Sequence, residues 1–127
     1  MNNNQDSHYT LPENWIWSNF DNITTFITDF QANGSFASLK ENVKYCEKKN
    51  YAILVRLRDL RDNLTKIDDL IYIDKDGYGF LKKSSLKGGE ILVANVGAGV
   101  GTTLIMPQVN QPATLGPNMF LILNSAN

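Results

Sequence analysis

Tyr51-Ala-Ile-Leu-Val-Arg-Leu-Arg58 is the stretch that decides the fold, because it is a short apolar run rich in β-branched residues and such runs form strands. Side chains alternate between the two faces of a strand. In this strand, the side chains that point toward the core would be Ile53, Val55 and Leu57. The side chains that point away from it would be Leu54, Arg56 and Arg58. We therefore expect a strand that presents two arginines on a rigid scaffold.

Further strands are predicted on both sides of this stretch. On the carboxyl side, the segments with strand character are Leu70–Ile73, Ile91–Ala94, Thr103–Met106 and Met119–Leu123. The second and third of these flank Gly97–Gly101, which predicts a turn between antiparallel partners. Trp15–Trp17 is a further short strand in this interpretation, because its two tryptophans alternate onto one face. The central strands are expected at 53–57, 91–94 and 119–123.

Two or three short helices are predicted to accompany the strands. Ser35 is a typical N-cap for a helix that runs to about Tyr45. Asp74 is a typical N-cap for a helix that runs to Lys83. Another helical turn is predicted from the spacing of Ile23, Phe26 and Ile27. The fold class expected is α+β, as a single domain with a mostly antiparallel twisted sheet.

The chain has 127 residues, of which 43% are hydrophobic, and this suits one domain with a buried core. We expect the polar residues 1–10 to be disordered and residues 11–127 to form the domain. No apolar run approaches the roughly 20 residues that span a bilayer, and the N-terminus is not similar to a secretory signal. A single cysteine, Cys46, forms no internal disulfide. These features predict a cytoplasmic protein without a membrane partner.

The net charge of −1 hides a strong asymmetry along the chain. All twelve lysines and arginines lie between Lys40 and Lys87, with eight of the thirteen acids, so this segment has an excess of four positive charges. The chain before it is acidic, and the chain after it is almost uncharged. Clustered positive charge on a nearly neutral chain is typical of a protein with an anionic partner such as DNA. The alternative is that the lysine pairs only solvate helix ends.

Two motifs are similar to ligand sites but depart from the residues that such sites need. Asp74-Lys-Asp-Gly-Tyr-Gly79 begins like a calcium loop. However, Tyr78 stands at the fifth position, where such a loop has Asp or Asn, and Ser85 stands at the twelfth, where it has a bidentate Glu. Gly97–Gly101 is followed by a strand-like run, whereas a phosphate loop leads into a helix. This glycine run is still the basis of one alternative, a small nucleotide-binding or enzyme domain.

Side chains with catalytic potential are scattered in the sequence. His8 is alone in the polar N-terminus, and Cys46 has no histidine near it. The Asp68-Asp69 pair lies in a charged turn, where solvated carboxylates are more common than a general acid and base. We therefore expect a protein that is not an enzyme, with no catalytic residue, no metal and no cofactor.

Polar and basic residues near two predicted elements are the candidates for DNA contact. The helix start at 33–40 offers amides and hydroxyls that suit a phosphate, and the alternative is a plain capped turn. Arginines on the strand at 51–58 suit a phosphate or a guanine edge, and the alternative is pairing with Asp59 or Asp62. The candidate DNA-binding residues are Asn33, Gly34, Ser35, Ser38, Lys40, Arg56, Arg58, Arg61 and Asn95.

Five segments carry a resemblance to a known family, in the family's order. They are Leu11-Pro-Glu-Asn-Trp-Ile-Trp17, Ala32–Val43, Tyr51–Asp59, Lys87-Gly-Gly-Glu-Ile-Leu-Val93 and Leu115–Phe120. Together they resemble the target-recognition domain of the DNA specificity subunit of type I restriction–modification enzymes. The first is similar to the family's Leu-Pro-x-x-Trp-x-Trp opening, and the fourth to its Gly-Asp-Ile-Leu strand. The resemblance covers about residues 11–123.

This resemblance implies a non-catalytic protein that directs other subunits to DNA. A specificity subunit reads a split site with two recognition domains, and helical spacers between them dock methyltransferase subunits. The implied partners are double-stranded DNA and, in a full-length subunit, the methyltransferase and the motor/nuclease subunits. The resemblance covers one recognition domain and no helical spacer, so we expect an incomplete subunit with weak DNA affinity. A further alternative is a protein-interaction module of a restriction complex that uses the uncharged stretch Ile91–Asn127.

Overall fold

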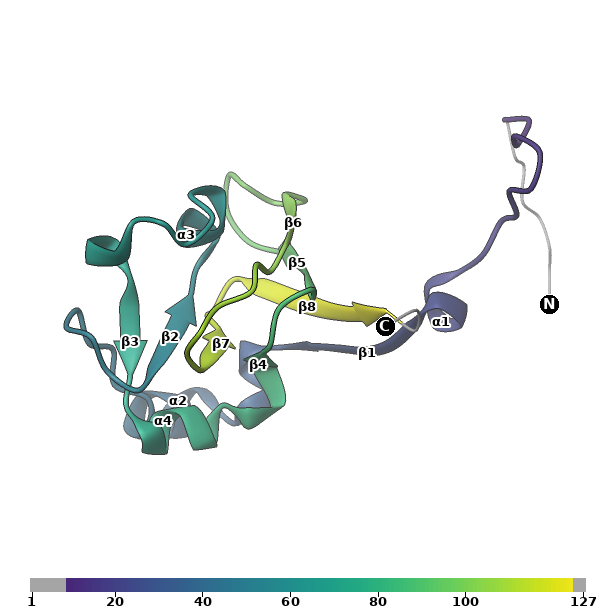
Figure 1. Ribbon diagram of the computed structural model, residues 1–127. Coiled ribbons are helices and arrows are strands. Elements are labelled where there is room, and N and C mark those ends of the chain that lie inside the picture. Colours follow the sequence, from purple (N-terminus) through teal and green to yellow (C-terminus); the bar gives the residue numbers. More distant parts are fainter. Residues whose placement is uncertain (1–8, 125–127) are drawn as a thin grey trace.

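Two four-stranded sheets form the centre of the protein (Figure 1). They are seen in a computed structural model, which describes residues 9–124. Four α-helices and three 3₁₀ helices surround the sheets in this part of the chain, and this confirms the predicted α+β class. The sequence predicted a single sheet, and the structure has two. Residues 1–8, which include His8 and most of the N-terminus that was predicted to be disordered, lie outside the described residues.

Sheet 1 has the strand order β1-β8-β5-β6. Its strands are β1 (Thr24–Asp29), β8 (Met119–Asn124), β5 (Ile91–Ala94) and β6 (Thr103–Ile105). All of its pairings are antiparallel, and the β5–β6 pairing confirms the one predicted across the glycine-rich turn. The outer ends of β1 and β8 project from the rest of the molecule as a two-stranded extension that ends at α1 (Phe20–Ile23) (Figure 1).

Sheet 2 has the strand order β3-β2-β7-β4. Its strands are β3 (Ile71–Ile73), β2 (Ala52–Val55), β7 (Ala113–Leu115) and β4 (Ser85–Leu86). β2 pairs with β3 in the antiparallel sense and with β7 in the parallel sense. All four residues of β2 are buried, so this strand has hydrophobic neighbours on both faces.

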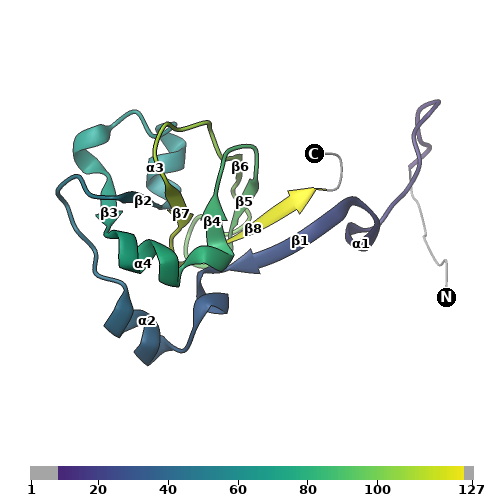
Figure 2. The same cartoon turned by 60° about the horizontal axis from the view of Figure 1, so that its bottom comes forward.

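The alternating side chains of β2 enter two separate cores. Ile53 and Val55 belong to the larger core, which lies between sheet 2 and the sheet 1 residues Leu92, Met119 and Leu121. The smaller core lies between sheet 2 and the helices α2 (Phe36–Asn42) and α4 (Lys75–Phe80), which lie side by side (Figures 1 and 2). Its buried members are Phe30, Leu39, Val43, Ala52, Leu54, Ile73 and Leu81.

The N-caps predicted for both of these helices are confirmed. The Ser35 hydroxyl accepts a hydrogen bond from the Ser38 N–H at 3.2 Å, and the Asp74 carboxylate accepts one from the Gly77 N–H at 2.7 Å. Both helices end earlier than predicted, because α2 stops at Asn42 and α4 gives way to a 3₁₀ helix. The 3₁₀ helices are η1 (Phe30–Asn33), η2 (Ile67–Asp69) and η3 (Lys82–Ser84). No helix in the described residues is long and apolar enough to cross a membrane.

The strand predicted over 51–58 ends at Val55, which corrects the placement of both arginines. Asp59 Oδ2 accepts the Arg56 backbone N–H at 2.9 Å, so the chain turns into the helix α3 (Leu57–Arg61) immediately after β2. Arg56 is therefore the N-cap residue of α3, and Arg58 lies on that helix. A local bond to a carboxylate overrides the strand-like alternation of the sequence.

The N-terminal part of the chain also differs from its prediction. Trp15–Trp17 forms no strand, and its two tryptophan side chains are exposed. Phe26 and Ile27 belong to β1, whereas the helical turn α1 ends at Ile23. The strands β1, β4 and β7 were not predicted, and each gains its partner from a distant part of the sequence.

Substitution of Gly116 tests the contact between the end of β7 and the end of β2. A Cβ atom at Gly116 would lie 2.7 Å from the Val55 carbonyl oxygen, and this oxygen belongs to the backbone of a buried strand. We expect Gly116→Ala to lower the free energy of unfolding by roughly 1–3 kcal/mol, as measured by urea denaturation. Gly79→Ala is the control, because Gly79 is exposed on α4 with no atom within 4 Å of an added Cβ. Alanine in a helix should stabilise it slightly, and equal stability of the two variants would contradict this account.

Candidate nucleic-acid interface

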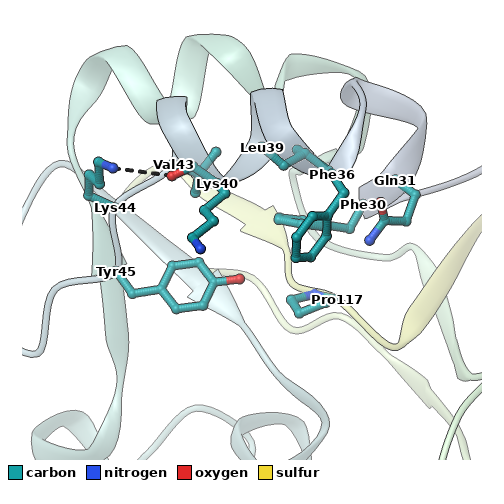
Figure 3. A pocket seen from close by; sticks show the side chains of 9 residues that line it. All are labelled: Phe30, Gln31, Phe36, Leu39, Lys40, Val43, Lys44, Tyr45 and Pro117. Carbon is teal, nitrogen blue, oxygen red and sulfur yellow. Dashed lines mark hydrogen bonds between the residues drawn. The ribbon is translucent and has the colours of Figure 1, made fainter.

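Two adjoining hollows lie beside the carboxyl ends of the parallel strands β2 and β7. Tyr45 and Pro117 line both, so they form the boundary between them. The first hollow, of about 500 Å³, is lined by Phe30, Gln31, Phe36, Leu39, Lys40, Val43, Lys44, Tyr45 and Pro117 (Figure 3). The second hollow, of about 280 Å³, is lined by Tyr45, Leu54, Arg56, Leu57, Arg58, Val96, Pro117, Asn118 and Met119.

The pairing of β2 with β7 brings these distant residues together. Val55 stands opposite Leu115 in the parallel register, and the Gly116 N–H donates to the Val55 carbonyl at 2.8 Å. Arg56 directly follows β2 and Pro117 lies two residues after the end of β7, so the two chain segments leave the sheet at the same place. Sites at the carboxyl ends of parallel strands are common in proteins, because the loops there converge.

Arg56 is held by hydrogen bonds within the protein. Its guanidinium donates to both carboxylate oxygens of Asp59 at 3.0 Å and to the Asp69 carbonyl at 2.6 Å. The Asp59 side chain is only 2% exposed, against 28% for Arg56. This pairing is the alternative that the sequence left open for Arg56. It fixes the start of α3 and leaves the guanidinium few free donors.

Arg58 and Arg61 lie on α3 with exposed side chains. The Arg58 guanidinium is 4.0 Å from the Asp69 carboxylate, with 65% of its side chain exposed, so the pairing is weak. The two arginines are three residues apart in a helix and therefore share one of its faces. A Cβ atom at Gly99 would meet the Arg61 guanidinium at 3.1 Å, so Arg61 lies against the turn that joins β5 to β6.

The predicted group at 33–40 is divided between structural and exposed roles. The Asn33 amide donates to the Phe30 carbonyl and the Ser84 hydroxyl, and its oxygen accepts the Lys83 N–H. The hydroxyl groups of Ser35 and Ser38 bond to each other at 3.0 Å at the start of α2, which agrees with the capped turn. Gly34 is half-buried beside Phe80. Lys40 is exposed and lines the first hollow.

Asn95 lies apart from the other candidates. Its backbone N–H donates to the Asn118 carbonyl at 3.1 Å, but the residue lines a different hollow, with Ile27, Asp29 and Phe120. The structure therefore brings Lys40, Arg56 and Arg58 to the two adjoining hollows. Arg61 lies beside them on α3, and the Asn33–Ser38 group and Asn95 line neither hollow.

Sequence reasoning missed several residues of the two hollows. Phe36, Lys44 and Tyr45 fall in the helix that was predicted to run to about Tyr45, but they are not among the candidate residues, and neither are Pro117 and Asn118. The only available signal was a basic residue next to an aromatic one at Lys44-Tyr45, which is typical of surfaces that bind nucleic acid. Partial burial raises the pKa of the Tyr45 phenol above its usual value of 10.0. This group is therefore protonated at neutral pH and available as a hydrogen-bond donor.

A second basic surface surrounds another hollow at the base of the β1–β8 extension. This hollow of about 690 Å³ is lined by Phe26, Leu121 and three lysines, Lys82, Lys83 and Lys87, among others. The buried Glu90 carboxylate accepts the backbone N–H groups of Lys87 and Gly88 and so fixes the turn. These lysines line a separate hollow that has no residue in common with the two hollows at Tyr45.

The glycine-rich run forms a turn between two strands, and the segment from Asp74 begins a helix. Gly97–Gly101 joins β5 to β6, with positive φ angles at both end glycines and a hydrogen bond from the Gly101 N–H to the Ala94 carbonyl. Asp74 caps α4. Within residues 9–124, no group of three or more His, Cys, Asp or Glu side chains is placed to hold a metal ion.

A scan against known protein families and a search of curated proteins found no match. The function is therefore inferred from the geometry and charge of the described residues. The described residues that line the two adjoining hollows have cationic, aromatic and amide side chains, grouped around Tyr45 and Pro117. Neither lining contains an aspartate or glutamate.

Replacement of the two arginines distinguishes a structural role from a surface role. Arg56→Ala should lower the free energy of unfolding by roughly 1–3 kcal/mol, because it leaves the buried Asp59 carboxylate with fewer donors. Arg58→Ala should change it by no more than about 0.5 kcal/mol, because that side chain is exposed. Urea denaturation at neutral pH measures both. If Arg58→Ala lowered the free energy of unfolding as much as Arg56→Ala does, the assigned roles would be wrong.

Proposed function

We propose that this chain is a DNA-binding domain that reads sequence and has no catalytic role of its own. The observation that supports this most directly is the convergence of Lys40, Lys44 and Arg58 on the hollows around Tyr45, with no carboxylate in either lining. Among the described residues, neither Lys40 nor Lys44 is in an ion pair. Exposed cations without acidic partners favour contact with phosphate.

The proposal assigns different tasks to different cations. Lys40 and Lys44 contact phosphate groups, because an ammonium at the end of a flexible chain suits a point charge. Arg58 and Arg61 share a face of α3, and their planar guanidinium groups match the acceptors on a guanine edge. Arg56 positions α3 through Asp59, so it contributes to recognition without contacting DNA itself.

The family resemblance supplies the wider setting of this proposal. We propose that the domain reads one half of a split site for a type I restriction–modification system in the cytoplasm. In a full-length specificity subunit, methyltransferase and motor/nuclease subunits would then act on the DNA that this domain selects. The duplex contact is the part of the proposal that the isolated chain can test.

A second candidate function is a protein-interaction module, as the sequence also allowed. One face of sheet 1 carries an apolar hollow of about 890 Å³. Ile27, Val93 and Phe120 line it, with two further isoleucines from β5 and β8. Uncovered apolar surface of this kind is typical of a protein interface, and co-precipitation with a methyltransferase subunit tests it. Loss of the complex in an Ile27→Lys variant that still folds would support this candidate.

The DNA-binding proposal is tested by the salt dependence of affinity. We expect this chain to bind a duplex selected from a random pool, with an affinity that falls steeply as salt rises. Lys40→Ala should weaken binding to all sequences alike and reduce the slope of log K against log salt by about 0.9. Arg58→Ala should cost roughly 1–3 kcal/mol and relax preference at one base pair. Fluorescence anisotropy measures each of these quantities.

Lys75→Ala is the matched control for these variants. Lys75 is exposed on α4 and lines neither hollow, so its loss should leave affinity and salt slope unchanged. If Lys40→Ala and Arg58→Ala bind selected DNA like the unaltered chain at several salt concentrations, the proposed interface is wrong.

A further inference from the structure

The first hollow presents aromatic side chains that the fold itself does not bury. Phe36 projects from α2 with 76% of its surface exposed, and Tyr45 lies across the hollow with 55% exposed. Leu39, Val43 and Phe30 form a buried apolar floor (Figure 3). A hollow of about 500 Å³ with apolar walls and a few polar groups has the size and composition of a small-molecule site.

The charges around this hollow select the kind of ligand. Lys40 extends from α2 toward Tyr45 (Figure 3), and the Lys44 ammonium donates to the Lys40 carbonyl at 3.1 Å, which keeps it at the rim. Two ammonium groups at one rim without a carboxylate in the lining repel each other and favour an anion. The protonated phenol of Tyr45 and the amide of Gln31 add hydrogen-bonding groups without adding charge.

We propose that this hollow accepts one unpaired nucleotide of a bound DNA strand, with its base against Tyr45 and Phe36 and its phosphate at Lys40 and Lys44. A flat heteroaromatic ring next to a negative charge is the chemistry that matches these walls and this rim. A base exposes its flat faces to a side chain only when it leaves the stack, and aromatic residues beside cations bind such bases with little sequence preference. This inference rests on the proposed DNA-binding function.

Three DNA duplexes of the same sequence test the proposed nucleotide site with the unaltered chain. The first is fully paired, the second carries one extra unpaired thymidine, and the third carries one extra abasic nucleotide at the same place. The third has the additional phosphate and flexibility of the second but no base. We expect the thymidine bulge to bind about tenfold more tightly than the other two, because only it supplies a ring for stacking.

Substitutions at the aromatic walls connect this preference to the hollow. Tyr45→Leu keeps an apolar side chain but loses the ring, so it should abolish the tenfold preference, whereas Tyr45→Phe should retain it. Phe36→Ala is an independent variant, because this exposed side chain contributes little to the fold. The preference of the Phe36→Ala variant for the thymidine bulge should also fall. Lys75→Ala is the control and should bind all three duplexes like the unaltered chain.

The outcomes separate this inference from the function on which it rests. Equal affinity for the paired, bulged and abasic duplexes overturns the inference and leaves the DNA-binding proposal in place. A bulge preference that survives in folded Tyr45→Leu and Phe36→Ala variants also overturns it, because the base would then bind elsewhere. Failure to bind any of the three duplexes at low salt overturns both. A preference that depends on both rings supports the hollow as the nucleotide site.

Discussion

The parallel pairing of β2 with β7 is the constraint on which the other parts of this structure depend. Parallel neighbours cannot be joined by a hairpin, so the chain has to leave the sheet and return in the same direction. Here the whole segment from Arg56 to Pro112 makes that return, and it contributes elements to both sheets. Because β2 is buried on both faces, these elements and α2 must cover it from two sides. Two cores result, and the two hollows lie where the paired strands end.

Buried polar side chains hold the turns around this framework. Asp59 organises the start of α3, and Glu90 organises the turn before β5. The Thr114 hydroxyl connects β7 to η3, because it donates to the Ser84 carbonyl and lies within hydrogen-bond distance of the Ser84 hydroxyl. In the described residues, no buried side-chain nitrogen or oxygen is without a hydrogen-bond partner. A hydrogen bond to a charged group contributes about 1.5–3 kcal/mol, and an unpaired buried group would cost as much. Exposed cations such as Arg58 therefore project from backbone that is rigidly supported.

Local interactions could be predicted from the sequence, and long-range ones could not. Ser35 and Asp74 cap helices through bonds to residues three positions ahead, and β5 and β6 pair across one turn, so each signal lies within a short window. The hydrogen bond between the Arg56 N–H and Asp59 is also local. The apolar run before Asp59 nevertheless favoured a strand that continued to residue 58. β7 is three residues long and finds its partner in β2, far away in the sequence. Tyr45 and Pro117 become neighbours only through that pairing, so the candidate site could be predicted only in part.

The pairing of β1 with β8 has a consequence for how the protein is made. Among the strands in residues 9–124, β1 leaves the ribosome first and β8 last. β1 therefore has no partner until the intervening chain and β8 have been translated. At roughly 5–20 residues per second, this wait lasts about 5–20 s. During that time Phe26 and Ile27 are open to other nascent chains, and a polysome brings such chains close together. Chaperone binding to the emerging N-terminal strand would protect the yield of the native fold.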